Sequence, residues 1–244
     1  MRICERIIDL HYYDVDRNRN MSPRAILRYM AELAAVHNDS TSSRQIDGSS
    51  HGWMLNKWKV KIKTYPRIYD RLKLRTWISK IDRFFVAREF AIEDEEGQDL
   101  VVASSLWVFI DMEKRRPARL DSSMIDYDLV VDKAYFRDYR RFTRDEELDF
   151  DASFKVRRAD IDINNHVNNL VYFDWILETI PEDIYLNSRL LDFEIDYKKE
   201  LRYPDKLSCK SRLEAGDQLE IVHGIYNEDG ELNLMAVTNW THKV

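Results

Sequence analysis

One histidine of this chain stands in a cluster of acids and amides that could carry out proton-transfer chemistry. The segment 160–169 contains Asp162, Asn164 and His166. An imidazole exchanges protons near neutral pH, and carboxylate and amide neighbours can orient it. In an extended strand the three side chains would share one face, where burial is costly unless they are paired or used. The alternative interpretation is a structural network of caps and turns, which Asp and Asn favour.

The cluster has a counterpart near the start of the chain. Residues 14–18 and 160–164 both read Asp-x-Asp-x-Asn. Asn20 stands in the first copy where the second has His166, so only one copy retains a titratable group at this position. This difference predicts one active site per chain.

A second motif, Gly-x-Ser-x-Gly around Ser50, matches the nucleophile elbow of serine hydrolases. That motif must follow a buried strand and open a helix. Here a polar segment precedes it and the alternating, strand-like residues 53–63 follow it. We therefore expect no catalytic role for Ser50. The other histidines show no metal-ligand spacing, so neither a metal nor a cofactor is expected.

Each copy of the motif is followed by a predicted helix. Ser22 and Pro23 form an N-cap and first-turn pair ahead of apolar residues at helical spacing. In the second copy Asn168 or Asn169 can cap a helix over 170–180, which Pro181 ends. This second helix is apolar almost all round, which predicts that it is buried.

Alternating segments after each helix predict antiparallel strands. Apolar residues alternate with lysines over 57–63 and with acids over 191–197. Gly97 and Gly230 predict hairpin turns, and each precedes a tryptophan at the same spacing. The sequence therefore predicts an α+β fold, a tandem double hotdog in which two antiparallel sheets each wrap around a buried helix. The expected domains are residues 1–115 and 151–244, joined by a charged linker over 116–150.

Composition narrows the function classes. A net charge of −6 argues against a broad nucleic-acid surface. No apolar run is long enough to span a membrane, and the acidic first residues do not resemble a signal or transit peptide. Cys4 and Cys209 fit neither a zinc site nor a disulfide framework. We therefore expect a cytoplasmic protein with two free thiols.

The chain resembles the acyl-acyl carrier protein (acyl-ACP) thioesterases of plants and bacteria. The match runs through 160–169 into Tyr172 and 175–178, and its further blocks lie at 65–66, 87–89, 103–108 and 115–116. The resemblance implies hydrolysis of a fatty acyl-ACP to free fatty acid and ACP, which terminates fatty acid synthesis. It also implies catalytic residues at Asp162, Asn164, His166 and Glu200.

The resemblance also frames the mechanism. Plant members have a cysteine where this chain has Leu201, so a cysteine nucleophile is ruled out at that position. We expect direct attack by water that Glu200 or His166 deprotonates, with Asn164 positioning the water and Asp162 orienting its neighbours. The backbone amides of Val167 and Asn168, at a helix start, are the expected oxyanion donors.

Two expectations stay open at the sequence level. By simple alternation Glu200 falls on the polar face of its predicted strand, so it is either a plain exposed glutamate or is redirected by a bulge. The N-terminal hotdog is the expected acyl-chain pocket, although core packing explains its candidate lining residues equally well: Met30, Leu33, Leu55, Trp58 and Trp107.

Other functions remain possible from the sequence. They are a hotdog acyl-CoA thioesterase, an enoyl-acyl hydratase and a non-catalytic acyl-binding protein. The expected partner is acyl-loaded ACP. Because the duplication already supplies two hotdog units, either a monomer or a homodimer is expected.

Overall fold

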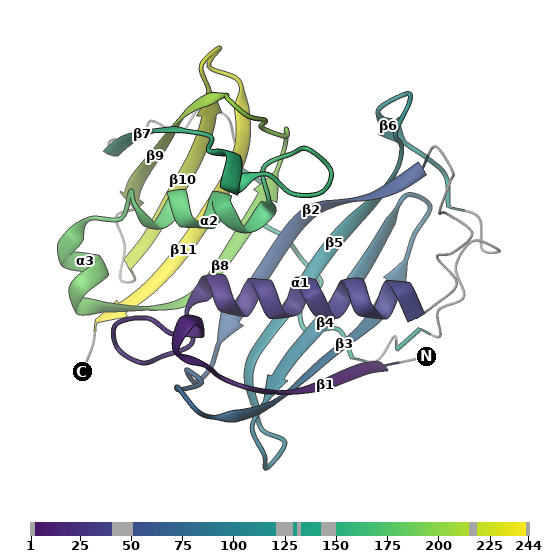
Figure 1. Ribbon diagram of the computed structural model, residues 1–244, viewed down its shortest axis with the longest axis vertical. Coiled ribbons are helices and arrows are strands. Elements are labelled where there is room, and N and C mark those ends of the chain that lie inside the picture. The colour runs from purple at the N-terminus through teal and green to yellow at the C-terminus, as the bar shows by residue number, and fades with distance from the viewer. Residues whose placement is uncertain are drawn as a thin grey trace. The chain divides into compact units, whose positions relative to one another are not determined.

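The computed structural model describes residues 3–40, 51–120, 129–130, 133–142, 150–214 and 219–242 (Figure 1). The chain divides into two compact units, Met1–Asp138 and Tyr139–Val244. Each unit consists of an antiparallel sheet with a helix against it (Figure 1). The predicted fold class is therefore confirmed.

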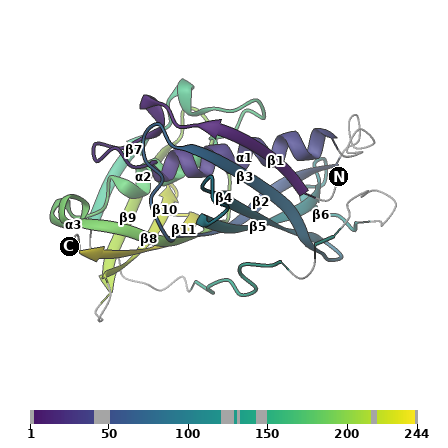
Figure 2. The ribbon, with the colours of Figure 1, turned by 90° about the horizontal axis from the view of Figure 1, so that it is seen from below.

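In the first unit the sheet has the order β1-β3-β4-β5-β2, and the short β6 pairs with β5. Its strands are β1 (Ile3–Asp9), β2 (His51–Ile62), β3 (Arg71–Ile81), β4 (Phe85–Glu93), β5 (Asp99–Asp111) and β6 (Arg116–Pro117). A single 3-10 turn, η1 (Tyr12–Asp14), connects β1 to helix α1 (Pro23–Ser40). Figure 2 shows α1 along one face of this sheet.

Helix α1 begins where the sequence predicts. The Ser22 hydroxyl accepts a hydrogen bond from the Ala25 amide at 3.1 Å, which satisfies one of the unpaired amides of the first turn. Apolar side chains at helical spacing then turn toward the sheet and are fully buried, namely Ile26, Leu27, Met30 and Leu33. This burial holds the first motif copy, which precedes the helix, against the sheet.

The second unit repeats the plan with the strand order β8-β11-β10-β9-β7. Its strands are β7 (Phe150–Lys155), β8 (Ser188–Tyr197), β9 (Lys206–Glu214), β10 (Leu219–Asn227) and β11 (Leu232–His242). Between β7 and β8 lie the 3-10 turn η4 (Arg158–Asp160) and the helices α2 (Asn169–Leu177) and α3 (Glu182–Asn187).

Helix α2 ends earlier than predicted. Of the two predicted N-cap candidates, Asn168 is the one observed, because its side chain accepts a hydrogen bond from the Leu170 amide at 3.0 Å. The helix stops at Leu177 because the next residues tighten into a turn, in which the Thr179 amide and hydroxyl both donate to the Ile176 carbonyl. Pro181 does not end α2 but is the N-cap of α3.

The strand prediction over 191–197 is only partly confirmed. Phe193 and Ile195 are buried as expected, but Leu191 is 36% exposed and Leu190 is buried in its place. The pairing of β8 with β11 shifts register between Asn239 and Trp240, and this bulge exchanges the two faces. Both predicted hairpin turns are confirmed, since Gly97 and Gly230 close them with φ values of 81° and 76°.

Part of the segment after β6 runs along the sheet of the first unit. The Trp77 indole donates to the Lys133 carbonyl at 2.7 Å, and the Tyr135 amide donates to the Glu89 carboxylate at 3.1 Å. Glu89 is fully buried, and burial raises the pKa of its carboxyl although Ser79 and Ser104 hydrogen-bond to it. In the described residues, no helix has the length and hydropathy needed to cross a membrane.

Candidate functional site

The second motif copy forms a closed loop between η4 and α2. An isolated β-bridge joins Ile161 to Val167 and ties the two ends of the loop together. Inside it the Asp162 carboxylate accepts the amides of Asn164 at 2.8 Å and His166 at 3.3 Å. Asn165 has a φ of 60°, a left-handed conformation that Asn tolerates better than most residues.

This loop corrects the strand expectation for the motif. Asp162, Asn164 and His166 do not lie on one face of an extended segment, because the chain turns back on the Asp162 carboxylate. The Asn164 amide nitrogen, Nδ2, lies 3.4 Å from Asp162 Oδ2, and Asn164 is exposed. The motif therefore places Asp162 and Asn164 together, with the His166 backbone held by the same carboxylate.

His166 meets Glu200 across the site. Strand β8 ends at Tyr197, so Glu200 lies in the loop before β9 and the alternation of the strand no longer determines its direction. Its Oε2 atom lies 3.1 Å from His166 Nε2. The side chains are 16% exposed for His166 and 30% for Glu200, which gives a half-buried acid–imidazole pair that water can reach.

A third side chain contacts the same imidazole nitrogen. Arg202 Nη2 lies 2.9 Å from His166 Nε2, and Arg202 is itself exposed. No local pattern in the sequence marks this residue. The signal that could have found it is the extension of the internal repeat described below, in which a second arginine occupies the corresponding place.

Two tyrosines hold the loop that carries Glu200 and Arg202. The Leu201 amide donates to the Tyr172 hydroxyl at 2.9 Å, and the Tyr197 hydroxyl donates to the Asn169 carbonyl at 3.0 Å. Burial raises the pKa of both tyrosines, so each stays a neutral phenol at physiological pH. The loop is thereby fixed to helix α2.

The expected oxyanion donors are already engaged. The Val167 amide donates to the Leu201 carbonyl at 2.9 Å, and the Asn168 amide donates to the Asp160 carbonyl at 2.8 Å. A backbone amide has a single hydrogen, so neither group has one left for an oxyanion. This geometry differs from the sequence expectation, because the helix starts one residue after these two amides have been used to close the loop.

The first motif copy folds in the same way. Asp16 accepts the amides of Asn18 at 2.8 Å and Asn20 at 3.0 Å, and Arg19 has a φ of 64°. A β-bridge joins Val15 to Met21, as Ile161 is joined to Val167. The two loops thus share their carboxylate-centred turn and their left-handed residue.

The repeat extends to the loop that faces each motif. The Met21 amide donates to the Pro66 carbonyl at 2.7 Å, as Val167 does to Leu201. The Arg67 amide donates to Asp70 Oδ2 at 2.7 Å, and the Arg202 amide donates to Asp205 Oδ2 at 2.8 Å. By this correspondence Arg67 matches Arg202, and Tyr65 stands where the second unit has Glu200.

Two other predicted features belong to the part of the chain that forms the first unit. Ser50 lies outside the described residues, and the segment after it is strand β2 rather than the helix that a nucleophile elbow requires. The candidate acyl-pocket residues Met30, Leu33, Leu55 and Trp58 are buried in the first unit, whereas Trp107 is half-buried.

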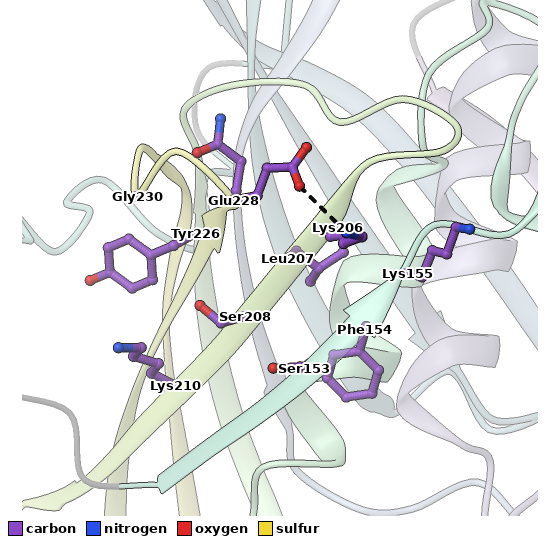
Figure 3. A pocket seen from close by; sticks show the side chains of 11 residues that line it. Ser153, Phe154, Lys155, Lys206, Leu207, Ser208, Lys210, Tyr226, Glu228 and Gly230 are labelled. Carbon is purple, nitrogen blue, oxygen red and sulfur yellow. Dashed lines mark ion pairs between the residues drawn. The ribbon is translucent and has the colours of Figure 1, made fainter.

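The second unit also carries an open groove of about 910 Å³ at the edge formed by β7, β9 and β10 (Figure 3). Lys155, Lys206 and Lys210 line it, and Lys206 lies 3.9 Å from Glu228. Its lining includes none of the residues predicted for catalysis. The groove is therefore separate from the His166–Glu200 pair.

Comparison with known proteins assigns the chain to a family. The model for the acyl-ACP thioesterase N-terminal domain matches residues 3–127, and the model for the C-terminal domain matches residues 143–242. The chain belongs to the acyl-ACP thioesterase family. This assignment confirms the resemblance seen in the sequence.

Curated members of the family cover nearly the whole chain. A palmitoyl-acyl carrier protein thioesterase of Arabidopsis thaliana is 25% identical over 95% of it, and a dodecanoyl-[acyl-carrier-protein] hydrolase of Cinnamomum camphora is 25% identical over 99%. The chain spans 62% and 68% of the lengths of these two relatives.

Solved structures agree on the fold. A putative oleoyl thioesterase from Lactobacillus plantarum superposes with a TM-score of 0.87 at 23% identity, covering 99% of this chain and 97% of that one. A 12:0-ACP thioesterase from Umbellularia californica gives a TM-score of 0.86 at 23% identity, over 99% and 94%. Such likeness supports the double hotdog architecture of this family member.

Proposed function

We propose that this protein hydrolyses the thioester of a fatty acyl-ACP and releases free fatty acid and ACP. The observation that carries the proposal is the 3.1 Å contact between His166 and Glu200, since the matching positions of the first unit hold Asn20 and Tyr65. Family membership across both units supports the same reaction. The proposed partner is therefore an acyl carrier protein bearing a fatty acyl chain.

The proposed chemistry is direct attack of water on the thioester carbonyl. Glu200 or His166 removes a proton from the water as its oxygen bonds to the carbonyl carbon. The carbon–sulfur bond then breaks, and the leaving thiolate takes up a proton to become the ACP thiol. Asn164 positions the water, and Asp162 holds the Asn164 and His166 backbone through the amides that it accepts.

A different backbone amide fits the oxyanion role. Val167 and Asn168 already donate to carbonyls, but Asn169 is the first residue of α2, and its amide has no acceptor among the described residues. The first amides of a helix have no partner within the helix and lie at the positive end of its dipole. We assign the developing negative charge on the thioester oxygen to this amide.

The proposal also assigns a different role to each unit. The second unit, with its expected boundary at residue 151, carries the catalytic residues, and the first, residues 1–115, accommodates the acyl chain. Large apolar side chains are buried inside the first unit, including Trp58, whose ring centroid lies 4.9 Å from that of Phe90. We place the enzyme in the cytoplasm, in keeping with Cys4 and Cys209, which are both buried free thiols.

A substrate comparison tests the function. Purified protein is offered palmitoyl-ACP, palmitoyl-CoA and an enoyl-CoA, and free thiol and hydrated product are measured. We expect thiol release to be fastest with acyl-ACP. A preference for acyl-CoA, hydration of the enoyl group, or binding of acyl-ACP without thiol release would each contradict the proposal.

A further inference from the structure

The His166 imidazole nitrogen Nε2 has two neighbours of opposite charge. Glu200 Oε2 lies 3.1 Å away and Arg202 Nη2 lies 2.9 Å away. A carboxylate only accepts hydrogen bonds, and a guanidinium only donates them. Both contacts cannot be good hydrogen bonds in the same protonation state, because Nε2 either carries a hydrogen or offers a lone pair.

Each state satisfies one neighbour and opposes the other. If Nε2 carries a proton, it donates to Glu200 and its hydrogen faces the N–H of Arg202. If Nε2 is bare, it accepts from Arg202 and its lone pair is occupied. The contact with Arg202 is the shorter of the two, and only a bare Nε2 can accept it, which points to the second state.

We propose that Arg202 is a positioning residue that keeps the His166 proton on Nδ1 and leaves Glu200 as the general base. This inference rests on the proposed thioester hydrolysis and decides between its two candidate bases. With its Nε2 lone pair engaged by Arg202, His166 cannot take the proton of the attacking water. Glu200, which receives no proton from His166, remains a carboxylate able to do so.

The other charged and titratable groups around the pair do not replace Arg202. Asp162 binds the backbone amides of its own loop, and Asp205 accepts the Arg202 amide. Tyr172, on α2, is a neutral phenol whose hydroxyl accepts the Leu201 amide. Of the two side chains that contact His166 Nε2, Arg202 is the cation.

The chain supplies a matched control for this residue. Arg67 holds the corresponding position in the first unit, and its amide makes the same bond to an aspartate. The residue opposite it is Asn20, which is joined to Arg67 by a β-bridge and has no titratable group. Replacing Arg67 removes a charge from the same loop geometry without touching an imidazole.

The first test is spectroscopic and needs no substrate. Nitrogen-15 spectra of histidine-labelled wild type, Arg202→Ala, Arg202→Lys and Arg67→Ala are recorded at alkaline pH, with the His166 signal assigned from its loss in His166→Ala. We expect the Nδ1–H tautomer in wild type and a shift toward Nε2–H of about threefold in Arg202→Ala, the size typical of an exposed charged contact. Arg67→Ala should match wild type, and Arg202→Lys should restore part of the wild-type ratio.

The second test is the pH profile of kcat/KM for acyl-ACP. Without the guanidinium, His166 Nε2 can compete with Glu200 for the proton of the water, so the acidic limb of Arg202→Ala should differ from the wild-type limb by about half a pH unit. The inference fails if wild-type His166 carries its proton on Nε2, or if Arg67→Ala shifts the spectrum or the limb as much as Arg202→Ala. If no variant hydrolyses acyl-ACP, the proposed function fails, whereas the spectra still test the proton position.

Discussion

The two motif loops have the same backbone and different chemistry. In each, an aspartate accepts two amides of its own loop, a β-bridge closes the ends, and the second residue of that bridge donates its amide to a facing loop. The first copy has Asn20 and Tyr65 where the second has His166 and Glu200. The turn network is therefore common to both units, whereas the imidazole of His166 and the carboxylate of Glu200 are present only in the second copy.

The cores beneath the loops differ as well. Phe90 of β4 and His223 of β10 occupy matching positions in the two hairpins. Phe90 pairs with Ala103 and His223 pairs with Ala236. Both side chains are fully buried. His223 Nε2 contacts the Thr238 hydroxyl at 2.9 Å, so the second unit contains a polar network where the first has an aromatic ring pair.

The largest expected effect distinguishes His166 from Asn20, its counterpart in the first unit. His166→Ala should lower kcat/KM for acyl-ACP by about 100-fold, because the imidazole that contacts both Glu200 and Arg202 is lost and the base is misplaced. Asn20→Ala, at the matching position, should stay close to wild type. Steady-state thiol release measures both, and equal losses would show that the loop acts through stability alone.

A smaller effect separates the two loop aspartates. Asp16→Ala and Asp162→Ala should each destabilise the protein by about 1 kcal/mol, because each leaves two loop amides without their acceptor. Only Asp162→Ala should also lower kcat/KM, by about tenfold, through misplacement of Asn164 and His166. Thermal unfolding combined with kinetics checks this, and a similar activity loss in Asp16→Ala would remove the distinction.

The core difference predicts a pH dependence of stability. Burial lowers the pKa of His223 to about 3, whereas the unfolded chain takes up this proton below about pH 6.5. The free energy of unfolding is therefore unaffected by this histidine above about pH 6.5, and it decreases as the pH falls from there toward 3. His223→Phe, which copies Phe90, should weaken the stability loss between pH 7 and pH 5 by about 2 kcal/mol, as measured by urea unfolding. An unchanged pH dependence would show that His223 is not buried as a neutral ring.

The smallest expected effect concerns Asp14, which lies under the first loop. Burial raises the pKa of its carboxyl, but hydrogen bonds from the His11 amide and the Tyr29 hydroxyl, with the charge of Arg28, outweigh burial and lower it. This contribution is present above the unfolded value near 3.9 and is lost as the pH falls through the folded value. Asp14→Asn should therefore be less stable than wild type at pH 7, by about 1 kcal/mol, and this difference, measured by thermal melting, should shrink as the pH falls below the unfolded value. A difference that stays constant over this range would contradict the assignment.

Local signals in the sequence predict the helix starts, the hairpin turns and the motif that holds Asp162, Asn164 and His166. The Ser22 and Asn168 caps, the hairpin glycines and the repeated Asp-x-Asp-x-Asn are short-range patterns whose physical meaning does not depend on the rest of the chain. Glu200 is predicted only by the resemblance to a family. It lies beyond the end of β8, where the alternation of buried and exposed residues in a strand no longer applies.

Long-range geometry accounts for what the sequence did not reveal. Nothing local indicates that the Asp162 carboxylate folds the motif into a closed loop, or that this closure occupies the Val167 and Asn168 amides. The sequence does not reveal Arg202 as a counterpart of Arg67. More residues separate Asp16 from Arg67 than separate Asp162 from Arg202, so a search for repeats at one fixed spacing does not align the two arginines. The contact between Arg202 and His166 exists only after β8 and β9 have brought the two loops together.

The measurement that tests the account most directly is the rate of thiol release from acyl-ACP by Glu200→Gln beside Tyr65→Phe. The glutamine keeps the size of the side chain but cannot accept a proton from water. We predict that Glu200→Gln loses at least about 100-fold in kcat/KM while Tyr65→Phe stays near wild type. A Glu200→Gln variant that hydrolyses acyl-ACP at the wild-type rate would contradict the assignment of catalysis to the second unit's acid–imidazole pair.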